Sequence, residues 1–250
     1  MKRIRILTRL AILTAAGAML AASSHAAPEP AKAPTPTAAA AAHFLAPDAI
    51  DLAAVLPPPP APGSLAAEAD LQTVLHVQES RTPEQIAWAR FVEDDDLFKN
   101  ARVLGAWFTK ENLPRTAAFF AQIDDDGYAV SRAAKARFPR PRPPVVDARV
   151  HPCVALPKSG SYPSGHSSQA WMWAGLLAEI FPEQRAALFE RARAVEWARV
   201  IGGVHFPTDT AGGRRLAEAI VAAFLKNPAV QAEIARCRAE AEPFLLRKAA

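Results

Sequence analysis

The chain has few cysteines and almost nothing typical of β-structure. Its 250 residues include two cysteines, Cys153 and Cys237, so at most one disulfide can form. Alternating, β-branched segments are nearly absent, which argues against a sheet. Beyond the N-terminus there is no apolar run long enough to cross a bilayer, and no internal repeat. Half of the residues are hydrophobic and 22% are charged, which excludes wholesale disorder and collagen-like repetition.

Residues 1–26 have the pattern of a secretory signal peptide. A basic start is followed by an apolar run from Leu10 to Ala22 and by small residues up to Ala26. The run is too short to span a membrane comfortably, which favours a cleaved signal over an anchoring helix. An uncleaved anchor shares the first two features and stays an alternative. We expect an exported, periplasmic or secreted protein with no stable membrane insertion after cleavage.

The basic character of the chain belongs to this segment. The formal net charge is +4, and residues 1–26 contain four basic residues, Lys2, Arg3, Arg5 and Arg9, and no acidic ones. Without them, 25 basic residues face 25 acidic ones. The mature chain is then formally neutral, so its composition gives no reason to expect a nucleic-acid partner.

We predict that residues 27–47, rich in alanine and proline with scarcely any charge, form a disordered tether. The prolines Pro57–Pro60 predict an extended strap that leads into the domain. Residues 48–250 are expected to form one compact all-α domain, because the apolar periodicity is helical almost throughout. Homo-oligomerisation is compatible with the sequence but is not indicated by it.

Helix boundaries follow from capping signals. Thr82, Pro83 and Gln85 form a capping-box pattern. Further helices are predicted over 113–138, 167–180, 182–200 and 207–227, and from Pro228 onward. The helix over 113–138 could be interrupted at Asp124–Gly127, where a solvated acidic turn is expected rather than a cation site. Export would allow Cys153 and Cys237 to form a disulfide, and two free thiols are the alternative.

Three segments combine cations with histidine. They read Lys135-x6-Arg142-Pro143, then Pro163-Ser164-Gly165-His166, then Arg199-x5-His205-x3-Asp209. Each alone is weak evidence, since basic turns, helix caps and His–Asp contacts are common in proteins without catalytic function. Their joint occurrence in this order is specific.

This three-part pattern resembles that of the bacterial class A non-specific acid phosphatases. They belong to the type-2 phosphatidic acid phosphatase superfamily, which also contains the vanadium haloperoxidases. The resemblance covers about residues 57–245, and Ser161-Tyr162 before Pro163 favours the soluble branch over the membrane-embedded lipid phosphatases. It implies a helical bundle and hydrolysis of small phosphomonoesters with broad specificity, with phosphotransfer to alcohols as a side reaction.

The resemblance also implies roles for individual residues. His205 would attack phosphorus and form a phosphohistidine, Asp209 would orient it, and His166 would protonate the leaving group. The phosphate would be held by the remaining motif residues, which are Lys135, Arg142, Ser164, Gly165 and Arg199. Guanidinium groups, an ammonium group and a glycine amide suit the charge on a transferring phosphoryl group. No metal or other cofactor is expected, since cations of the chain supply the charge.

Some points stay open at this stage. Arg140-Pro141 competes with Arg142-Pro143 as the phosphate-binding register. Ala198 stands where the family pattern has serine, which puts the positioning of Arg199 in doubt. The alternatives to a phosphatase are a vanadium-dependent haloperoxidase and a catalytically weak phosphate-binding protein of the cell envelope.

Overall fold

The computed structural model describes residues 42–249, and within that range every regular element is helical, as predicted. The signal peptide expected over residues 1–26 and most of the tether lie outside the described residues. The elements are α1 (Leu52–Val55), α2 (Leu65–Ser80), α3 (Pro83–Phe91), η1 (Leu97–Asn100), α4 (Ala101–Leu104), α5 (Pro114–Arg137), α6 (Pro143–Val146), α7 (Gly165–Ile180), η2 (Pro182–Gln184), α8 (Arg185–Ile201), α9 (Pro207–Phe224) and α10 (Pro228–Ala249).

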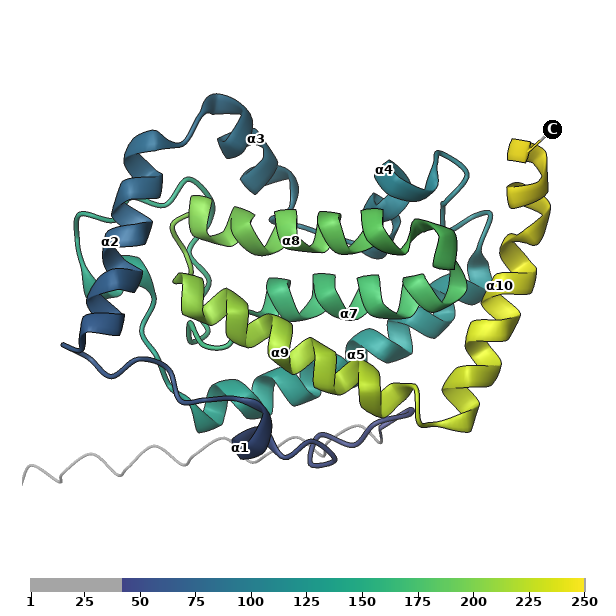
Figure 1. Ribbon diagram of the computed structural model, residues 1–250, viewed down its shortest axis with the longest axis horizontal. Coiled ribbons are helices and arrows are strands. Elements are labelled where there is room, and N and C mark those ends of the chain that lie inside the picture. Colours follow the sequence, from purple (N-terminus) through teal and green to yellow (C-terminus); the bar gives the residue numbers. More distant parts are fainter. Residues whose placement is uncertain (1–41, 250) are drawn as a thin grey trace, which may run out of the picture. The chain divides into compact units, whose positions relative to one another are not determined.

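Helix α7 is the centre of the bundle. It packs against α8 on one side, α9 on the other and α5 behind, and α10 crosses one end (Figure 1). Most of its side chains are buried, including Trp173, Leu176 and Leu177. Each large apolar side chain buried in this way contributes roughly 1.5–3 kcal/mol, so the bundle forms around this segment. Among the described residues, no helix is long and apolar enough to span a membrane.

The helix starts follow the expected capping chemistry. The capping box of Thr82 and Gln85 is present at the start of α3, and proline occupies the first position of α3, α5 and α9. Proline suits this position because its missing N–H would have no helical partner there. The expected break at Asp124–Gly127 was wrong, since α5 is continuous from Pro114 to Arg137.

The acidic run in α5 is not a solvated turn. The carboxylate of Asp126 is buried and accepts three backbone hydrogen bonds, from the N–H groups of His43, Phe44 and Leu45, at 2.7–3.0 Å. Leu45 is buried in the main core. Residues 43–45, assigned to the tether from composition, therefore pack on the bundle, because the Asp126 carboxylate accepts hydrogen bonds from their backbone N–H groups.

The proline strap, Pro57–Pro60, contacts Tyr162, which directly precedes the Pro163–His166 motif. The hydroxyl of Tyr162 donates a hydrogen bond of 2.7 Å to the carbonyl of Pro57, and Leu56 is buried beside the strap. The two cysteines are free thiols, so the disulfide alternative is not realised in this structure. Burial raises the pKa of the Cys237 thiol to about 11.

Glycine lets α9 approach the second motif closely. A Cβ atom on Gly213 would lie 2.5 Å from the carbonyl oxygen of Ser164, and one on Gly212 would lie 2.6 Å from the ring of Tyr162. The first contact is with backbone, which no side-chain rotation can relieve. The close packing of α9 on the start of α7 thus requires glycine at position 213.

We expect Gly213→Ala to lower the free energy of unfolding by about 1–3 kcal/mol, the usual cost of overpacking. Gly160→Ala is the control, because its Cβ would make only an ordinary 3.6 Å contact with the carbonyl of Arg140. Urea unfolding measures both variants. Equal unfolding midpoints for Gly213→Ala and the unmodified chain would contradict this description of the packing.

Candidate active site

The predicted site residues meet at one end of the bundle, at the left in Figure 1, where α5 and α8 end and α7 and α9 begin. A cavity of about 340 Å³ opens there. Of the eight residues, five line this cavity: Lys135, Arg142, Gly165, His166 and His205. The other three, Ser164, Arg199 and Asp209, are buried behind its wall.

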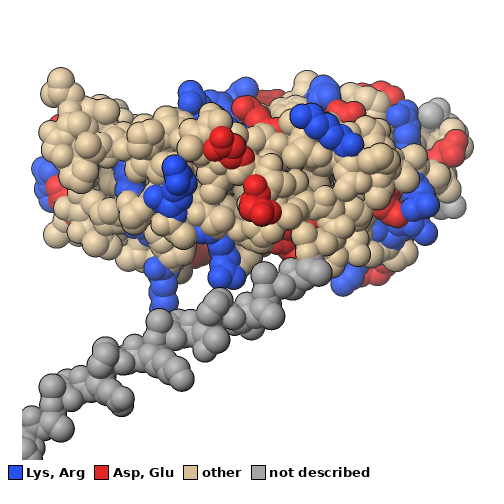
Figure 2. All heavy atoms as spheres, turned by 90° about the horizontal axis from the view of Figure 1, so that it is seen from below, with Lys and Arg blue, Asp and Glu red and all other residues tan. Residues whose placement is uncertain are grey.

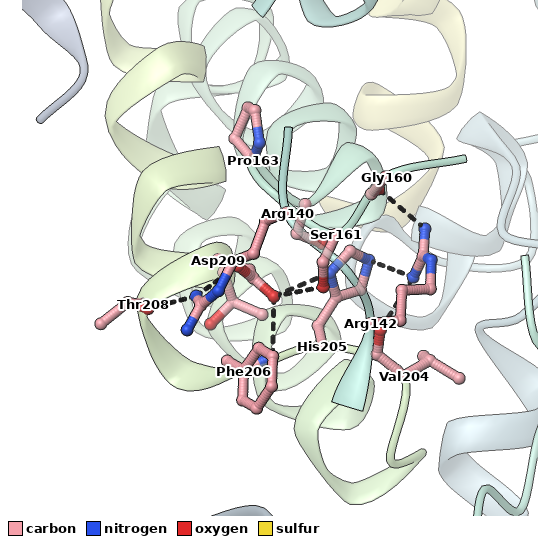
Figure 3. Close-up of polar contacts among 12 residues, drawn as sticks. Arg140, Arg142, Gly160, Ser161, Pro163, Val204, His205, Phe206, Thr208 and Asp209 are labelled. Carbon is pink, nitrogen blue, oxygen red and sulfur yellow. Dashed lines mark hydrogen bonds and ion pairs between the residues drawn. The ribbon is translucent and has the colours of Figure 1, made fainter. Parts of the chain in front are cut away.

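The contacts of His205 determine which ring nitrogen carries the proton. Its Nε2 atom lies 3.1 Å from a guanidinium nitrogen of Arg142 (Figure 3). Arginine can only donate hydrogen bonds, so Nε2 accepts and is unprotonated. In the neutral ring the proton then resides on Nδ1, which faces Asp209 Oδ2 at 3.5 Å. The nucleophilic lone pair is therefore on the Nε2 side, next to Arg142.

Asp209 is held by more than the histidine. Its Oδ2 atom accepts hydrogen bonds from the hydroxyl of Ser161 at 2.6 Å and from the N–H of Phe206 at 2.8 Å, and Oδ1 pairs with Arg140 at 2.7 Å (Figure 3). Burial alone would raise the pKa of this carboxyl. The contacts with His205, Arg140 and Ser161 outweigh burial and keep its pKa below the usual value. Asp209 is therefore a fixed carboxylate.

Arg140 belongs to the support of the site and not to its cavity. Its guanidinium bridges Asp209 and Asp70, each at 2.7 Å, and also donates to the hydroxyl of Thr208. Asp70 comes from α2, seventy residues before Arg140 in sequence, and also accepts a hydrogen bond from the hydroxyl of Thr208. Arg142 lines the cavity, whereas Arg140 does not. The choice of Arg142 as the phosphate-binding register stays a prediction. No sequence signal singled out Asp70.

His166 lies on the first turn of α7 with its ring partly buried. Its Nε2 atom is 2.8 Å from the carbonyl oxygen of Glu93. A carbonyl only accepts, so Nε2 carries a proton and Nδ1 is the atom that can take up and release one. Burial, reinforced by the charge of Arg199, lowers the pKa of His166 to about 4.

Burial also lowers the pKa of His205, to about 3, although Asp209 acts in the opposite direction. Two histidines with the ordinary pKa near 6.5 would predict a mildly acidic pH optimum. With pKa values of about 4 and about 3, the rings of His166 and His205 are instead neutral at pH 6. His166 can gain a proton there only when a phosphate anion offsets the surrounding cations, or when the substrate brings the proton.

Three buried or half-buried cations surround the histidines without an ion pair. Lys135, Arg142 and Arg199 form none among the described residues. Arg199 is 1% exposed, and its Nε and Nη1 atoms have no hydrogen-bond partner. Burial lowers the pKa of Arg199, and the charge of Glu93, which forms no ion pair with it, opposes this only in part. Buried donors without partners are costly, so this end of the bundle is built to receive an anion.

Lys135 has one donor to spare. Its ammonium group donates to the carbonyl oxygens of Gly160 and Pro163 at 2.8 and 2.6 Å, which leaves the third N–H available. Arg142 is fixed in a similar way by the carbonyl oxygens of Ser159 and Val204, both at 2.8 Å. Backbone oxygens therefore position both cations without neutralising them.

The motif Pro163-Ser164-Gly165-His166 forms the start of helix α7. Ser164 is the N-cap of α7, and its hydroxyl accepts from the N–H of Ser167 at 3.4 Å. Gly165 follows it and lines the cavity, with no atom near the position that a Cβ would take. The free N–H groups of this first turn favour an anion at the same end.

Ala198 is fully buried in the main hydrophobic core. Its methyl group offers no hydrogen bond, which agrees with the unpartnered nitrogens of Arg199. The described residues contain no group of three or more metal-ligating side chains. On the face that Figure 2 shows, basic side chains are interspersed with acidic ones and form no continuous stripe.

The lysine sets an expectation for pH dependence. Burial, together with the charge of Arg142, lowers the pKa of Lys135 to about 8. Its positive charge is therefore present below pH 8 and is lost as the pH rises through that value. We expect the affinity for inorganic phosphate, measured by calorimetry, to fall about tenfold per pH unit above pH 8. In Lys135→Arg the decline should begin at higher pH, and an unchanged affinity from pH 7 to 9.5 would contradict the assignment.

Comparison with known proteins points to the same family as the three sequence motifs. The model of the PAP2 superfamily matches residues 126–231. A non-specific acid phosphatase of Providencia stuartii is 31% identical over 206 residues, which cover 77% of this chain and 81% of the relative. An acid phosphatase of Zymomonas mobilis is 28% identical over 198 residues, which cover 75% of this chain and 74% of the relative.

Among solved structures, the chain is similar to a bacterial vanadium-dependent iodoperoxidase. The TM-score is 0.55 at 20% identity, covering 69% of this chain and 52% of that chain, a likeness of fold alone. The match to the acid phosphatases extends over most of both sequences. The chain therefore belongs to the class A non-specific acid phosphatases of the PAP2 superfamily.

Proposed function

We propose that this chain is an exported acid phosphatase that hydrolyses phosphate monoesters of broad structure through a phosphohistidine on His205. The observation that carries the proposal is the set of three unpaired cations around an imidazole whose Nε2 is unprotonated. No metal takes part, because Lys135, Arg142 and Arg199 supply the charge that transferring phosphoryl oxygens need. Removal of residues 1–26 and export to the periplasm are part of the proposal.

In the first step the phosphate displaces the contact between Arg142 and His205 Nε2. The freed lone pair attacks phosphorus, and the bond from phosphorus to the leaving oxygen breaks as the N–P bond forms. The imidazole keeps its Nδ1 proton and becomes positively charged, so the carboxylate of Asp209 stabilises it. A proton from Nδ1 of His166 neutralises the departing alkoxide.

In the second step a water molecule attacks the phosphohistidine. His166, now neutral, takes a proton from the water through Nδ1, and the N–P bond breaks to release phosphate and restore His205. An alcohol that reaches the same position would accept the phosphoryl group in place of water, which gives the phosphotransferase side reaction. The same residues thus serve both half-reactions with opposite proton transfers.

The low pKa values of the two histidines suit their separate roles, His205 as nucleophile and His166 as acid and base. His205 stays neutral and nucleophilic well into the acid range, since its pKa is lowered to about 3. A phosphate monoester has its second pKa near 6, so below about pH 6 it arrives with a proton that His166 can receive. Activity in mildly acidic solution then follows from the substrate as much as from the imidazoles.

The alternatives have weaker support. A vanadium-dependent haloperoxidase shares the fold, but the likeness is to half of a longer chain at 20% identity. A catalytically inactive phosphate-binding protein would not need the hydrogen bonds that hold Asp209 beside His205. The phosphatase proposal accounts for both the cations around the cavity and the hydrogen bonds that hold Asp209 beside His205.

Two variants and two leaving groups test the proposal. His205→Ala should lose activity toward both dinitrophenyl phosphate and an alkyl phosphate, on the order of 10⁴-fold or more. His166→Ala should lose about 10²- to 10⁴-fold toward the alkyl phosphate, which needs a proton on its leaving oxygen, and far less toward the dinitrophenyl ester.

Steady-state kinetics measures these losses. A denaturing quench of the reaction with substrate labelled in its phosphoryl group detects the phosphoenzyme. The label should be stable to alkali, labile to acid and absent from His205→Ala. Equal losses for the two esters in His166→Ala would overturn the general-acid role. Labelled His205→Ala protein would overturn the assigned nucleophile.

The support of Asp209 gives a further prediction. In Arg140→Lys a single ammonium group replaces the planar fork that bridges Asp70 and Asp209. We expect kcat to fall roughly 10- to 100-fold through misalignment of His205, with a smaller change in KM because Arg140 does not line the cavity. Arg149→Lys, which alters an exposed pair with Asp147, is the matched control and should behave like the unmodified chain. Unchanged kcat in Arg140→Lys would show that the bridge does not position the histidine.

A further inference from the structure

The cavity extends well beyond the phosphate-binding end. Helix α5 lines it with residues at helical spacing: Asp124, Gly127, Tyr128, Ser131, Arg132 and Lys135. Lys135 marks the phosphate end, and Asp124 precedes it by three helical turns, about 16 Å along the axis. Helix α7 lines the other wall from Gly165 to Met172, about 10 Å. The cavity is therefore a channel between two helices, long enough for an extended leaving group.

Asp124 stands at the far end of this channel with an unbalanced charge. Its Oδ1 atom accepts a hydrogen bond of 2.8 Å from the indole of Trp173, and none of the ion pairs among the described residues includes it. Its neighbours are accounted for, since Asp125 lies 3.5 Å from His43 and Asp126 holds the backbone of residues 43–45. In the fold the Asp124 carboxylate accepts hydrogen bonds from the side chains of Trp173 and Gln169, but no cation balances its charge and the proposed mechanism does not use it.

The electrostatics of the channel is thus bipolar. Cations surround the phosphate end, and a carboxylate lines the opposite end. Burial without a compensating cation raises the pKa of Asp124 to about 7, and an ammonium group beside it would favour the ionised form. The wall between the two ends includes the apolar side chains of Met172 and Ile220. At the lip, the ring of Tyr128 is exposed, with the guanidinium of Arg132 5.9 Å from its centroid.

We propose that this channel selects phosphomonoesters whose leaving group carries an ammonium group on an apolar or aromatic spacer, with Asp124 as its counter-ion. The phosphate would lie among the three cations, the spacer along Met172, and the ammonium at the carboxylate. This inference rests on the proposed phosphatase function and deepens it, because it assigns a leaving-group preference to the same site.

A matched pair of substrates tests the proposal. Tyramine O-phosphate and 4-propylphenyl phosphate have leaving groups of similar shape and reactivity, and they differ in an ammonium group in place of a methyl group. At pH 7 the unmodified chain should show kcat/KM at least about tenfold higher for the tyramine ester, as expected for a hydrogen bond to a charged group. Equal values for the two esters would overturn the proposal without any variant.

Two variants locate the preference. Asp124→Asn keeps an acceptor for the Trp173 indole but removes the charge, so it should abolish the preference and retain kcat/KM for the propyl ester. Asp125→Asn removes the same charge from the solvent side of α5 and should keep the preference. A preference that persists in Asp124→Asn would overturn the assignment of Asp124. Failure to hydrolyse either ester would instead overturn the phosphatase function, and with it this inference.

Discussion

Positive charge without ion-pair partners at one end of a helical bundle is the constraint on which the site depends. Lys135, Arg142 and Arg199 are held close together, and burial, followed by repulsion from the neighbouring cation, lowers the pKa values of Lys135 and Arg142. Burying charge in this way is costly unless something compensates it. Backbone carbonyl oxygens orient two of these cations without cancelling them, so the compensation is left for an anion.

Asp209 and Asp70 do not neutralise these cations but support His205. Asp209 and Asp70 are both bound to Arg140, and together they fix the position of His205 from behind. The network joins Asp70 of α2 to the start of α9, so helix α2 takes part in the support of the active site. The apolar packing of α7 between α8 and α9 provides the rigid frame on which these ends can be held.

Much of this could be predicted from the sequence. Prolines and caps predicted the starts of α3, α5, α9 and α10 to within one residue, because these signals act on the nearest backbone groups. Pro182, the predicted start of α8, instead begins the 3-10 helix η2, and α8 starts at Arg185. The motif residues gather at one end, as the resemblance implied. Their individual catalytic roles stay predictions.

The errors and omissions concern contacts between distant parts of the chain. Asp124, Asp125 and Asp126 look alike in sequence, yet one lines the channel, one lies beside His43 and one binds backbone N–H groups. Asp70 carries no local signal, since its partner is seventy residues away. Spacing along the chain cannot reveal such pairs, and the same limit hid the lowered pKa values of the buried histidines.

A crystal structure of the chain soaked with inorganic phosphate tests the central claim most directly. We predict one phosphate ion in the cavity, bonded to Nε and Nη1 of Arg199, to Arg142 and to the spare donor of Lys135, with phosphorus facing Nε2 of His205. A cavity left without phosphate at saturating concentration, or a phosphate bound away from Arg199 and His205, would contradict it.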